Sequence, residues 1–157
     1  MRLGRGSRCG VEFLLARDMG VCWGVRRASD MMERAAQERG QVPEQIIRSI
    51  LFRYAKEQFF LTLVAGPGQI SWRKLRLHLG LTRISMASEE QVLTVTGCAV
   101  GTVSPFGTPS PLRTLCDVNV FKLGEISLGC GLRGVAIIMR SADLQRALGK
   151  IELGQFC

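Results

Sequence analysis

The chain has 157 residues, of which 46% are hydrophobic and 22% are charged, a composition typical of one globular domain with a buried core. No apolar run is long enough to cross a bilayer, and the run at residues 13–16 is too short for a secretory signal. We therefore expect a cytoplasmic protein with no membrane partner. The formal net charge is +8, with the basic excess in the first half of the chain. A basic surface suits nucleic acid, but also a protein that is merely soluble.

Side chains suited to catalysis or metal binding are few. The chain has one histidine, His78, and six cysteines without CxxC spacing. A zinc site needs about four convergent ligands, and the sequence shows no such cluster, so we expect neither metal nor cofactor. Free thiols are expected in place of a disulfide framework. A Ser–His mechanism would depend on His78, which lies in a leucine-rich stretch typical of a helix surface.

The N-terminal segment differs in character from the rest. Residues 1–28 are rich in glycine and arginine and lack periodicity, so we interpret them as an N-terminal arm and assign the folded domain to residues 29–157. Ser29 is expected to cap a helix that ends at Gly40, because apolar residues share one face between them. Pro43 then predicts a short helical turn.

A hairpin and a helix are expected next. Residues 46–53 and 58–65 are β-branched and apolar, which predicts two strands that pair with each other. Ser71 is expected to cap a helix that ends at Gly80. Three basic residues of this helix lie off its apolar stripe and form either a solvated face or a contact for nucleic-acid phosphates: Arg73, Lys74 and Arg76.

The second half mixes strands and helices without regular alternation. Ser88 and Gln91 predict a capping box, opening a helix that ends before Gly97. Short strands are expected at residues 84–86, 114–120, 125–128 and 135–139, and Ser141 is expected to cap a last helix at 142–148. This order predicts an α+β domain, with a mixed and partly barrel-like β-sheet surrounded by helices.

The most distinctive stretch is Gly101-Thr-Val-Ser-Pro-Phe-Gly107. Glycine lets the backbone approach a ligand closely, and Pro105 stiffens the loop and extends Ser104. One interpretation is a rigid loop that grips a small polar ligand with its main chain. The other is an ordinary glycine–proline turn between two strands.

Several segments in this order and spacing resemble the YbaK family, which is similar to the editing insertion domain of bacterial prolyl-tRNA synthetases. The resemblance covers about residues 29–150. Its most specific element is the Gly101–Gly107 loop. The weaker elements include residues 45–52, 88–92, 116–117, 131–134 and 142–144.

The resemblance implies a free-standing deacylase that hydrolyses mischarged tRNA in trans, of the Cys-tRNA(Pro) or Ala-tRNA(Pro) type. The implied partners are mischarged tRNA and prolyl-tRNA synthetase. A pocket built for proline rejects similar or smaller side chains by only about 1–3 kcal/mol, so a second hydrolytic site is needed. The ester is already activated, and in the family a thiol, amine or hydroxyl of the substrate is thought to take part. Two alternatives stay open: a non-catalytic module of the same fold that binds tRNA or a synthetase, and an unrelated structural protein.

One position departs from the family pattern. The family carries lysine in a Lys-Thr-Leu strand, and this chain has Arg48 followed by Ser49 and Ile50. Arginine keeps the charge but cannot give up its proton. If the lysine acts by charge on a phosphate or the ester carbonyl, Arg48 can replace it as the catalytic residue. If the lysine shuttles a proton, Arg48 cannot.

The expected site joins Arg48 to the loop in one groove. Asp117 is expected either to orient loop N–H groups or a substrate amine, or to be a turn residue, and Gly131 either lines the site or serves turn geometry. The substrate-binding residues that we expect are Gly101, Thr102, Val103, Ser104, Pro105, Phe106, Gly107, Asp117 and Gly131.

Overall fold

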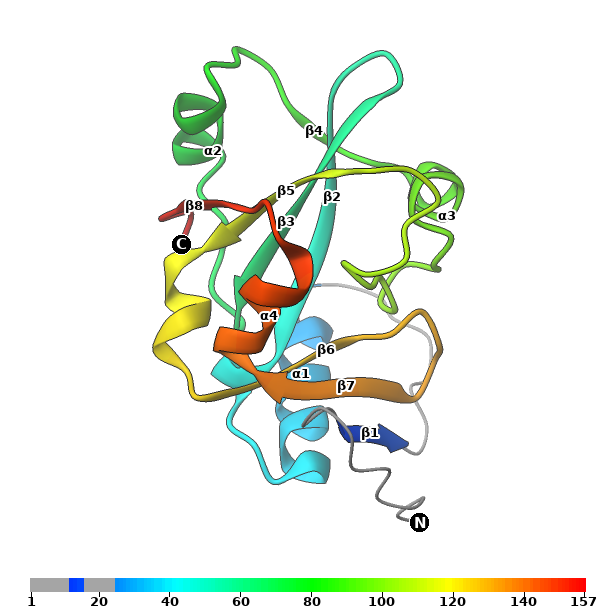
Figure 1. The fold of residues 1–157 in the computed structure, drawn as a ribbon, viewed down its shortest axis with the longest axis vertical. Coiled ribbons are helices and arrows are strands. Elements are labelled where there is room, and N and C mark those ends of the chain that lie inside the picture. The colour runs from blue at the N-terminus through cyan, green and yellow to red at the C-terminus, as the bar shows by residue number, and fades with distance from the viewer. Residues whose placement is uncertain (1–11, 16–24) are drawn as a thin grey trace.

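The computed structural model describes residues 12–15 and 25–157 and shows two β-sheets with helices around them (Figure 1). The first sheet is mixed, with the strand order β4 (Ser85–Met86), β2 (Ile47–Ala55), β3 (Gln58–Ala65), β5 (Arg113–Asp117) and β8 (Glu152–Gly154). The second is antiparallel, in the order β1 (Glu12–Leu15), β7 (Val135–Arg140) and β6 (Glu125–Gly129). This arrangement confirms the α+β fold with a mixed sheet, and the sheet is not a closed barrel.

The helices begin and end largely where the sequence indicates. They are α1 (Val25–Arg39), α2 (Trp72–Leu79), α3 (Glu89–Thr96) and α4 (Ser141–Leu148), with 3₁₀ turns η1 (Pro43–Gln45) and η2 (Val118–Lys122). Ser71 caps α2, and Ser88 and Gln91 form the expected capping box of α3. None of the helices in the described part of the chain is long and apolar enough to span a membrane.

Two hydrophobic clusters lie on opposite faces of the β2–β3 hairpin, because successive side chains of a strand point to opposite faces. Leu51 and Leu63 belong to a cluster that also contains Val92 of α3. Phe52 and Phe60 stack with ring centroids 5.3 Å apart and pack with Leu75 of α2 in the other cluster. Consequently α2 and α3 lie on opposite sides of the hairpin, as Figure 1 shows.

The N-terminal elements differ from expectation. Helix α1 begins at Val25 and not after Ser29, although Gly40 ends it with φ of 65° as expected. Strand β1 falls within residues 1–28, the segment interpreted as an arm, and its residue Phe13 pairs with Ile137 of β7. The rest of that segment before α1 lies outside the described residues.

Two further predictions were wrong in detail, and one short strand was missed. The strand expected at residues 114–120 ends at Asp117, because the Asp117 side chain accepts the N–H of Asn119 and opens η2. Ser141 does not cap α4, because its hydroxyl donates to the carbonyl of Leu123. Strand β8 was not predicted, since a three-residue strand with polar Glu152 has little sequence signal.

Asp117 anchors the C-terminal segment to the sheet. Its carboxylate is fully buried, and Oδ2 accepts the N–H groups of Phe156 at 2.6 Å and Cys157 at 3.0 Å. Oδ1 accepts the N–H of Asn119 at 2.9 Å. These bonds satisfy a buried carboxylate with main-chain donors, as its burial requires.

Asp117→Ala is therefore expected to destabilise the fold by about 3–5 kcal/mol, since three N–H groups lose their acceptor. Asp143→Ala is the control, because Asp143 pairs with the exposed Arg146 and should cost about 1 kcal/mol or less. Urea unfolding of both variants measures the difference. Equal losses would contradict an anchoring role for Asp117.

Candidate functional site

A cavity of about 980 Å³ opens beside the free edge of β2. Strand β2 forms one part of its wall, together with the end of β4 and the start of α3. The rest of the wall comes from the segment before and within the glycine-rich loop, the end of β6, the start of β7 and the last turns of α1. The volume lies at the upper end of the range common for small-ligand sites. Five stretches of the chain therefore converge on one cavity: residues 35–39, 46–51, 86–93, 99–103 and 128–136.

The cavity exists because β2 lacks a continuous neighbour on the side away from β3. Strand β4 covers only Phe52 and Arg53, and on this side Ile46 makes an isolated parallel bridge to Ser127 of β6. The Ile46 carbonyl accepts from Gly66 next to β3, so the main-chain groups of Ser49 point away from β3. Ser49 thus offers main-chain donors and acceptors at an open strand edge.

The side chain of Ser49 adds a further polar atom. Ser49 lines the cavity, and its Oγ is buried without a hydrogen-bond partner among the described residues. A buried hydroxyl without a partner is unfavourable, so it marks a place where a ligand or water would be bound. The family resemblance drew attention to Arg48, and sequence reasoning missed its neighbour Ser49.

The rest of the cavity wall is mainly apolar. The buried residues Ile47, Leu51, Val92, Val103 and Leu128 contribute to it, and all five belong to the core cluster between the two sheets. Four large apolar side chains at the cavity are more than half exposed: Met86, Leu93, Val100 and Leu132. An apolar cavity with few polar groups is typical of a small-ligand site.

The start of the glycine-rich loop is fixed against β6 by its backbone. The Thr102 carbonyl accepts the N–H of Gly131 at 2.8 Å, and the Thr102 N–H and hydroxyl both donate to the Ala99 carbonyl, at 3.0 and 2.8 Å. A Cβ at Gly129 would lie 2.7 Å from the carbonyl oxygens of Thr102 and Val103. Only glycine at 129 allows this approach, and sequence reasoning did not single it out.

The structure brings together only part of the expected groove. Gly101, Thr102, Val103 and Arg48 line the cavity, whereas Ser104, Pro105, Phe106 and Gly107 do not border it, and their part in binding substrate stays a prediction. The Ser104 hydroxyl accepts the N–H of Phe106, which turns the chain so that Phe106 packs on the core. Gly107 lies exposed beyond this turn.

Asp117 and Gly131 also lie outside the cavity wall. Asp117 has both oxygens occupied by main-chain donors, so the expectation that it faces the loop or a substrate amine does not fit its surroundings. Gly131, with φ of 89°, holds the loop by its N–H. Its positive φ agrees with the turn interpretation.

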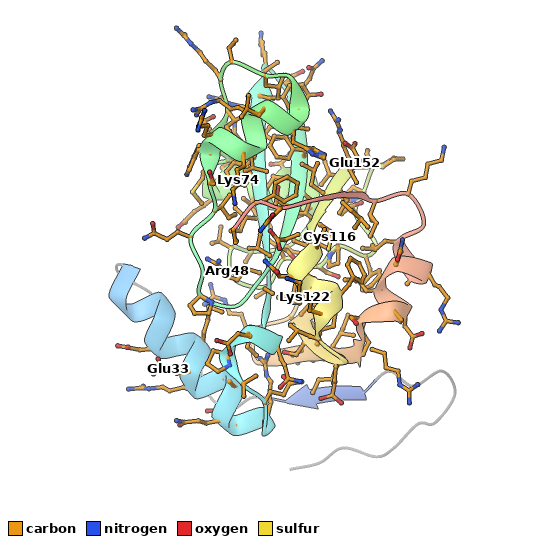
Figure 2. The ribbon with its side chains drawn as sticks, turned by 90° about the vertical axis from the view of Figure 1, so that its left-hand side faces the viewer. Glu33, Arg48, Lys74, Cys116, Lys122 and Glu152 are labelled. Atoms are coloured by element: carbon orange, nitrogen blue, oxygen red, sulfur yellow. The ribbon has the colours of Figure 1, made fainter. Side chains whose placement is uncertain are left out.

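Arg48 borders the cavity but is tied to another segment. Its Nη2 donates to the carbonyl of Gly68, while its Nε is buried and finds no hydrogen-bond partner in residues 12–15 and 25–157. Figure 2 shows it beside the segment that leads into α2, on the same side of the molecule as Lys74. Burial lowers the pKa of Arg48, and the nearby Cys157 thiol opposes that shift. The guanidinium nevertheless stays charged at neutral pH.

The cavity wall also carries charges that the sequence did not reveal. Arg39 from α1 and Arg133 from the β6–β7 loop are basic, while Glu89 and Glu90 of α3 are acidic. By contrast, the basic residues of α2 lie on the other side of the hairpin, and Lys74 donates to the Cys157 carbonyl at 3.0 Å. This separation favours a solvated face for Arg73, Lys74 and Arg76.

Gly129→Ala is expected to destabilise the protein by about 1–3 kcal/mol, because the new methyl group collides with two carbonyl oxygens. Gly124→Ala is the matched control: a Cβ there meets nothing within 4 Å, and the cost should be about 0.5 kcal/mol or less. Urea unfolding compares the two. The same midpoint for both variants would refute the close approach of loop and strand.

Solved structures share this architecture. A protein whose crystal structure was described as that of a candidate trans-editing enzyme for prolyl tRNA synthetase superposes with a TM-score of 0.78 at 22% identity, covering 93% of this chain and 85% of the other. At this identity the likeness shows the fold.

Curated relatives are similar over the same region. The chain is 31% identical over 117 residues to the uncharacterized protein YwhH of Bacillus subtilis, covering 74% of each chain. It is 31% identical over 100 residues to the multifunctional Ser/Thr-tRNA deacylase ProXp-y of Escherichia coli, covering 63% of this chain and 59% of the relative. It is 32% identical to the proline–tRNA ligase of Kosmotoga olearia over 60% of this chain, which is 17% of the ligase. The chain thus spans less than two thirds of the ligase and of the deacylase.

A match to a model of a whole protein family gives the family assignment. Residues 27–147 match the family model of the aminoacyl-tRNA editing domain. This match confirms the resemblance to the YbaK and prolyl-tRNA synthetase editing proteins. The chain belongs to the aminoacyl-tRNA editing domain family, and its relatives include a Ser/Thr-tRNA deacylase.

Proposed function

We propose that this protein is a trans-editing deacylase that hydrolyses the ester of mischarged tRNA, with cysteine or alanine on tRNA(Pro) as its substrates. One observation carries the proposal: an apolar cavity with an open strand edge at Ser49 on one side and the glycine-rich segment from Gly101 on the other. The cavity is large enough for an aminoacylated terminal ribose, and the exposed apolar side chains around it suit the faces of a nucleobase. Prolyl-tRNA synthetase is the proposed partner, in view of the similarity to proline–tRNA ligases.

The reaction requires the protein to position the ester more than it requires a side chain that acts as nucleophile or general base. Water attacks the ester carbonyl carbon, the bond to the ribose oxygen breaks, and that oxygen takes up a proton. A hydroxyl or amine of the substrate can assist the proton transfer, while the strand edge at Ser49 and the segment from Gly101 hold the ester in place. The proposed role of Arg48 is to favour, by its positive charge, the oxyanion that develops on the carbonyl. In the free protein its Nη2 is bonded to the Gly68 carbonyl and its side chain leaves β2 on the face opposite Ser49, so this role requires the guanidinium to turn toward the cavity.

The proposed substrate choice follows from the wall that surrounds Ser49. Ile47 and Leu51 flank it on the same face of β2, and Val103 approaches from the loop, so the space beside the hydroxyl is apolar. A small side chain such as that of alanine or cysteine fits such surroundings. The unpartnered Ser49 hydroxyl provides one hydrogen bond for a thiol or a substrate amine.

The second candidate function is a module that binds tRNA or a synthetase without hydrolysing the ester. Arg48 favours it, because arginine cannot shuttle a proton and its Nη2 is already bonded to Gly68. The two functions differ in turnover and not in binding.

A deacylation assay of the wild-type protein separates them. With cysteinyl-, alanyl- and seryl-tRNA(Pro) as substrates, we expect release of cysteine or alanine well above the spontaneous rate, and prolyl-tRNA(Pro) spared. Binding without turnover of any of the three would favour the module. Absence of both binding and turnover would exclude both functions.

Arg48 variants test how the charge acts. Arg48→Ala is expected to lower the deacylation rate on the order of a hundredfold, comparable with removing one donor to an oxyanion. Arg48→Lys should keep the charge and most of the activity. Equal rates for wild type and Arg48→Ala would show that Arg48 serves only its bond to Gly68. An inert wild type that Arg48→Lys activates would show that a proton must be shuttled.

A further inference from the structure

Arg39 is a half-buried cation of the cavity wall for which the proposed chemistry has no use. It lies in the last turn of α1, where a positive charge is favourable. Its Nη1 donates to the hydroxyl of Ser127 at 2.5 Å, and its Nε is buried without a partner in the described part of the chain. Burial lowers the pKa of Arg39 while the neighbouring Glu38 opposes the shift, yet the group stays charged.

A second arginine of the same chain shows what the Nε and Nη2 edge of Arg39 is suited to bind. In Arg113, Nε and Nη2 donate to the two carboxylate oxygens of Glu152 at 2.5 and 2.9 Å. That edge of a guanidinium matches the paired oxygens of carboxylates and phosphates. In Arg39, by contrast, the neutral hydroxyl of Ser127 occupies the opposite nitrogen, Nη1, and Nε has no acceptor among the residues that the structure describes.

No anionic partner within the described residues neutralises Arg39. The ion pairs found there are Arg113–Glu152, Arg146–Asp143 and the contact of His78 with Glu152. A desolvated guanidinium without a carboxylate is unfavourable in the free protein, and an anionic ligand would relieve that cost. The cavity's other half-buried arginine, Arg48, is less suited, because its Nη2 already donates to Gly68.

We propose that Arg39 binds the phosphate of the substrate's terminal nucleotide through its Nε and Nη2 edge and so positions the ester in the cavity. This assignment rests on the proposed function for the identity of the ligand. The group that Arg39 would bind is a phosphate ester. Because Nε is covered in the free protein, the side chain turns at its end to present both donors. The bond from Nη1 to Ser127 keeps the guanidinium at the cavity wall.

The test measures the affinity gained from one phosphate. The probes are a non-hydrolysable alanyl-adenosine amide with and without a 5′-phosphate, and inorganic phosphate alone, each titrated calorimetrically into the full chain. In the wild type we expect the 5′-phosphate to tighten binding about tenfold or more, as charged hydrogen bonds do. Arg39→Gln should abolish this gain, and Arg39→Lys should keep part of it.

Arg34→Gln is the matched control, because Arg34 lies on α1 with its side chain exposed and outside the cavity wall. It should retain the full gain. The assignment is overturned if Arg39→Gln keeps the preference for the phosphorylated probe, or if inorganic phosphate alone binds as tightly as that probe. The readout is binding, so a preference for the 5′-phosphate that is lost only in Arg39→Gln supports the assignment whether or not the protein deacylates tRNA. A failure to deacylate any tRNA would refute the proposed function and leave the assignment of Arg39 intact.

Discussion

The site depends on one gap in strand pairing. On the side away from β3, strand β2 is covered by β4 at one end, and Ile46, just before its other end, bridges to β6. Between these two contacts the main chain at Ser49 has no strand partner on this side in the described part of the fold. Unpaired strand edges usually invite other strands, so a protein keeps one only when something covers it. Here α3, the segment from Gly101 and the tip of the β6–β7 hairpin surround the gap, and a cavity results instead of a sheet edge open to solvent.

The surrounding elements are held by backbone contacts that leave little freedom. Gly129 lets the end of β6 approach the carbonyls of Thr102 and Val103, and the Gly131 N–H donates to the same Thr102 carbonyl. On the far face of the hairpin, Asp117 accepts hydrogen bonds from the C-terminal segment and holds it against the sheet that carries β2. Catalysis by positioning requires such rigidity, because a shift of about 1 Å in the reacting groups is costly.

Much of the fold could be read from the sequence. The β2–β3 hairpin, the capped starts of α2 and α3 and the glycine at their ends follow local rules, and these predictions were confirmed. The family could be recognised from the glycine-rich loop. What failed depended on which local side-chain bond forms and on what the core then accepts. The strand after residue 113 ends early because a side chain caps a 3₁₀ turn, and Phe106 turns toward the core.

The site was harder to predict than the fold, for a physical reason. Gly129 is important only because another segment approaches it, and Ser49 only because its strand edge is left open, so neither carries a local signal. Arg39 resembles an ordinary cation at a helix end until its burial beside Ser127 is seen. The roles of Arg48 and the loop residues in binding substrate stay predictions, whereas the place of each in the fold is known.

The most direct test of the account is to map where an aminoacyl-adenosine mimic binds, using amide chemical shifts of the labelled protein. The account predicts perturbations at Ser49, Gly101 and Val103 around the cavity, and none at Leu75 in α2 on the far side of the hairpin. Perturbations confined to α2 and the C-terminal segment, with the amides of Ser49 and Gly101 unchanged, would contradict it.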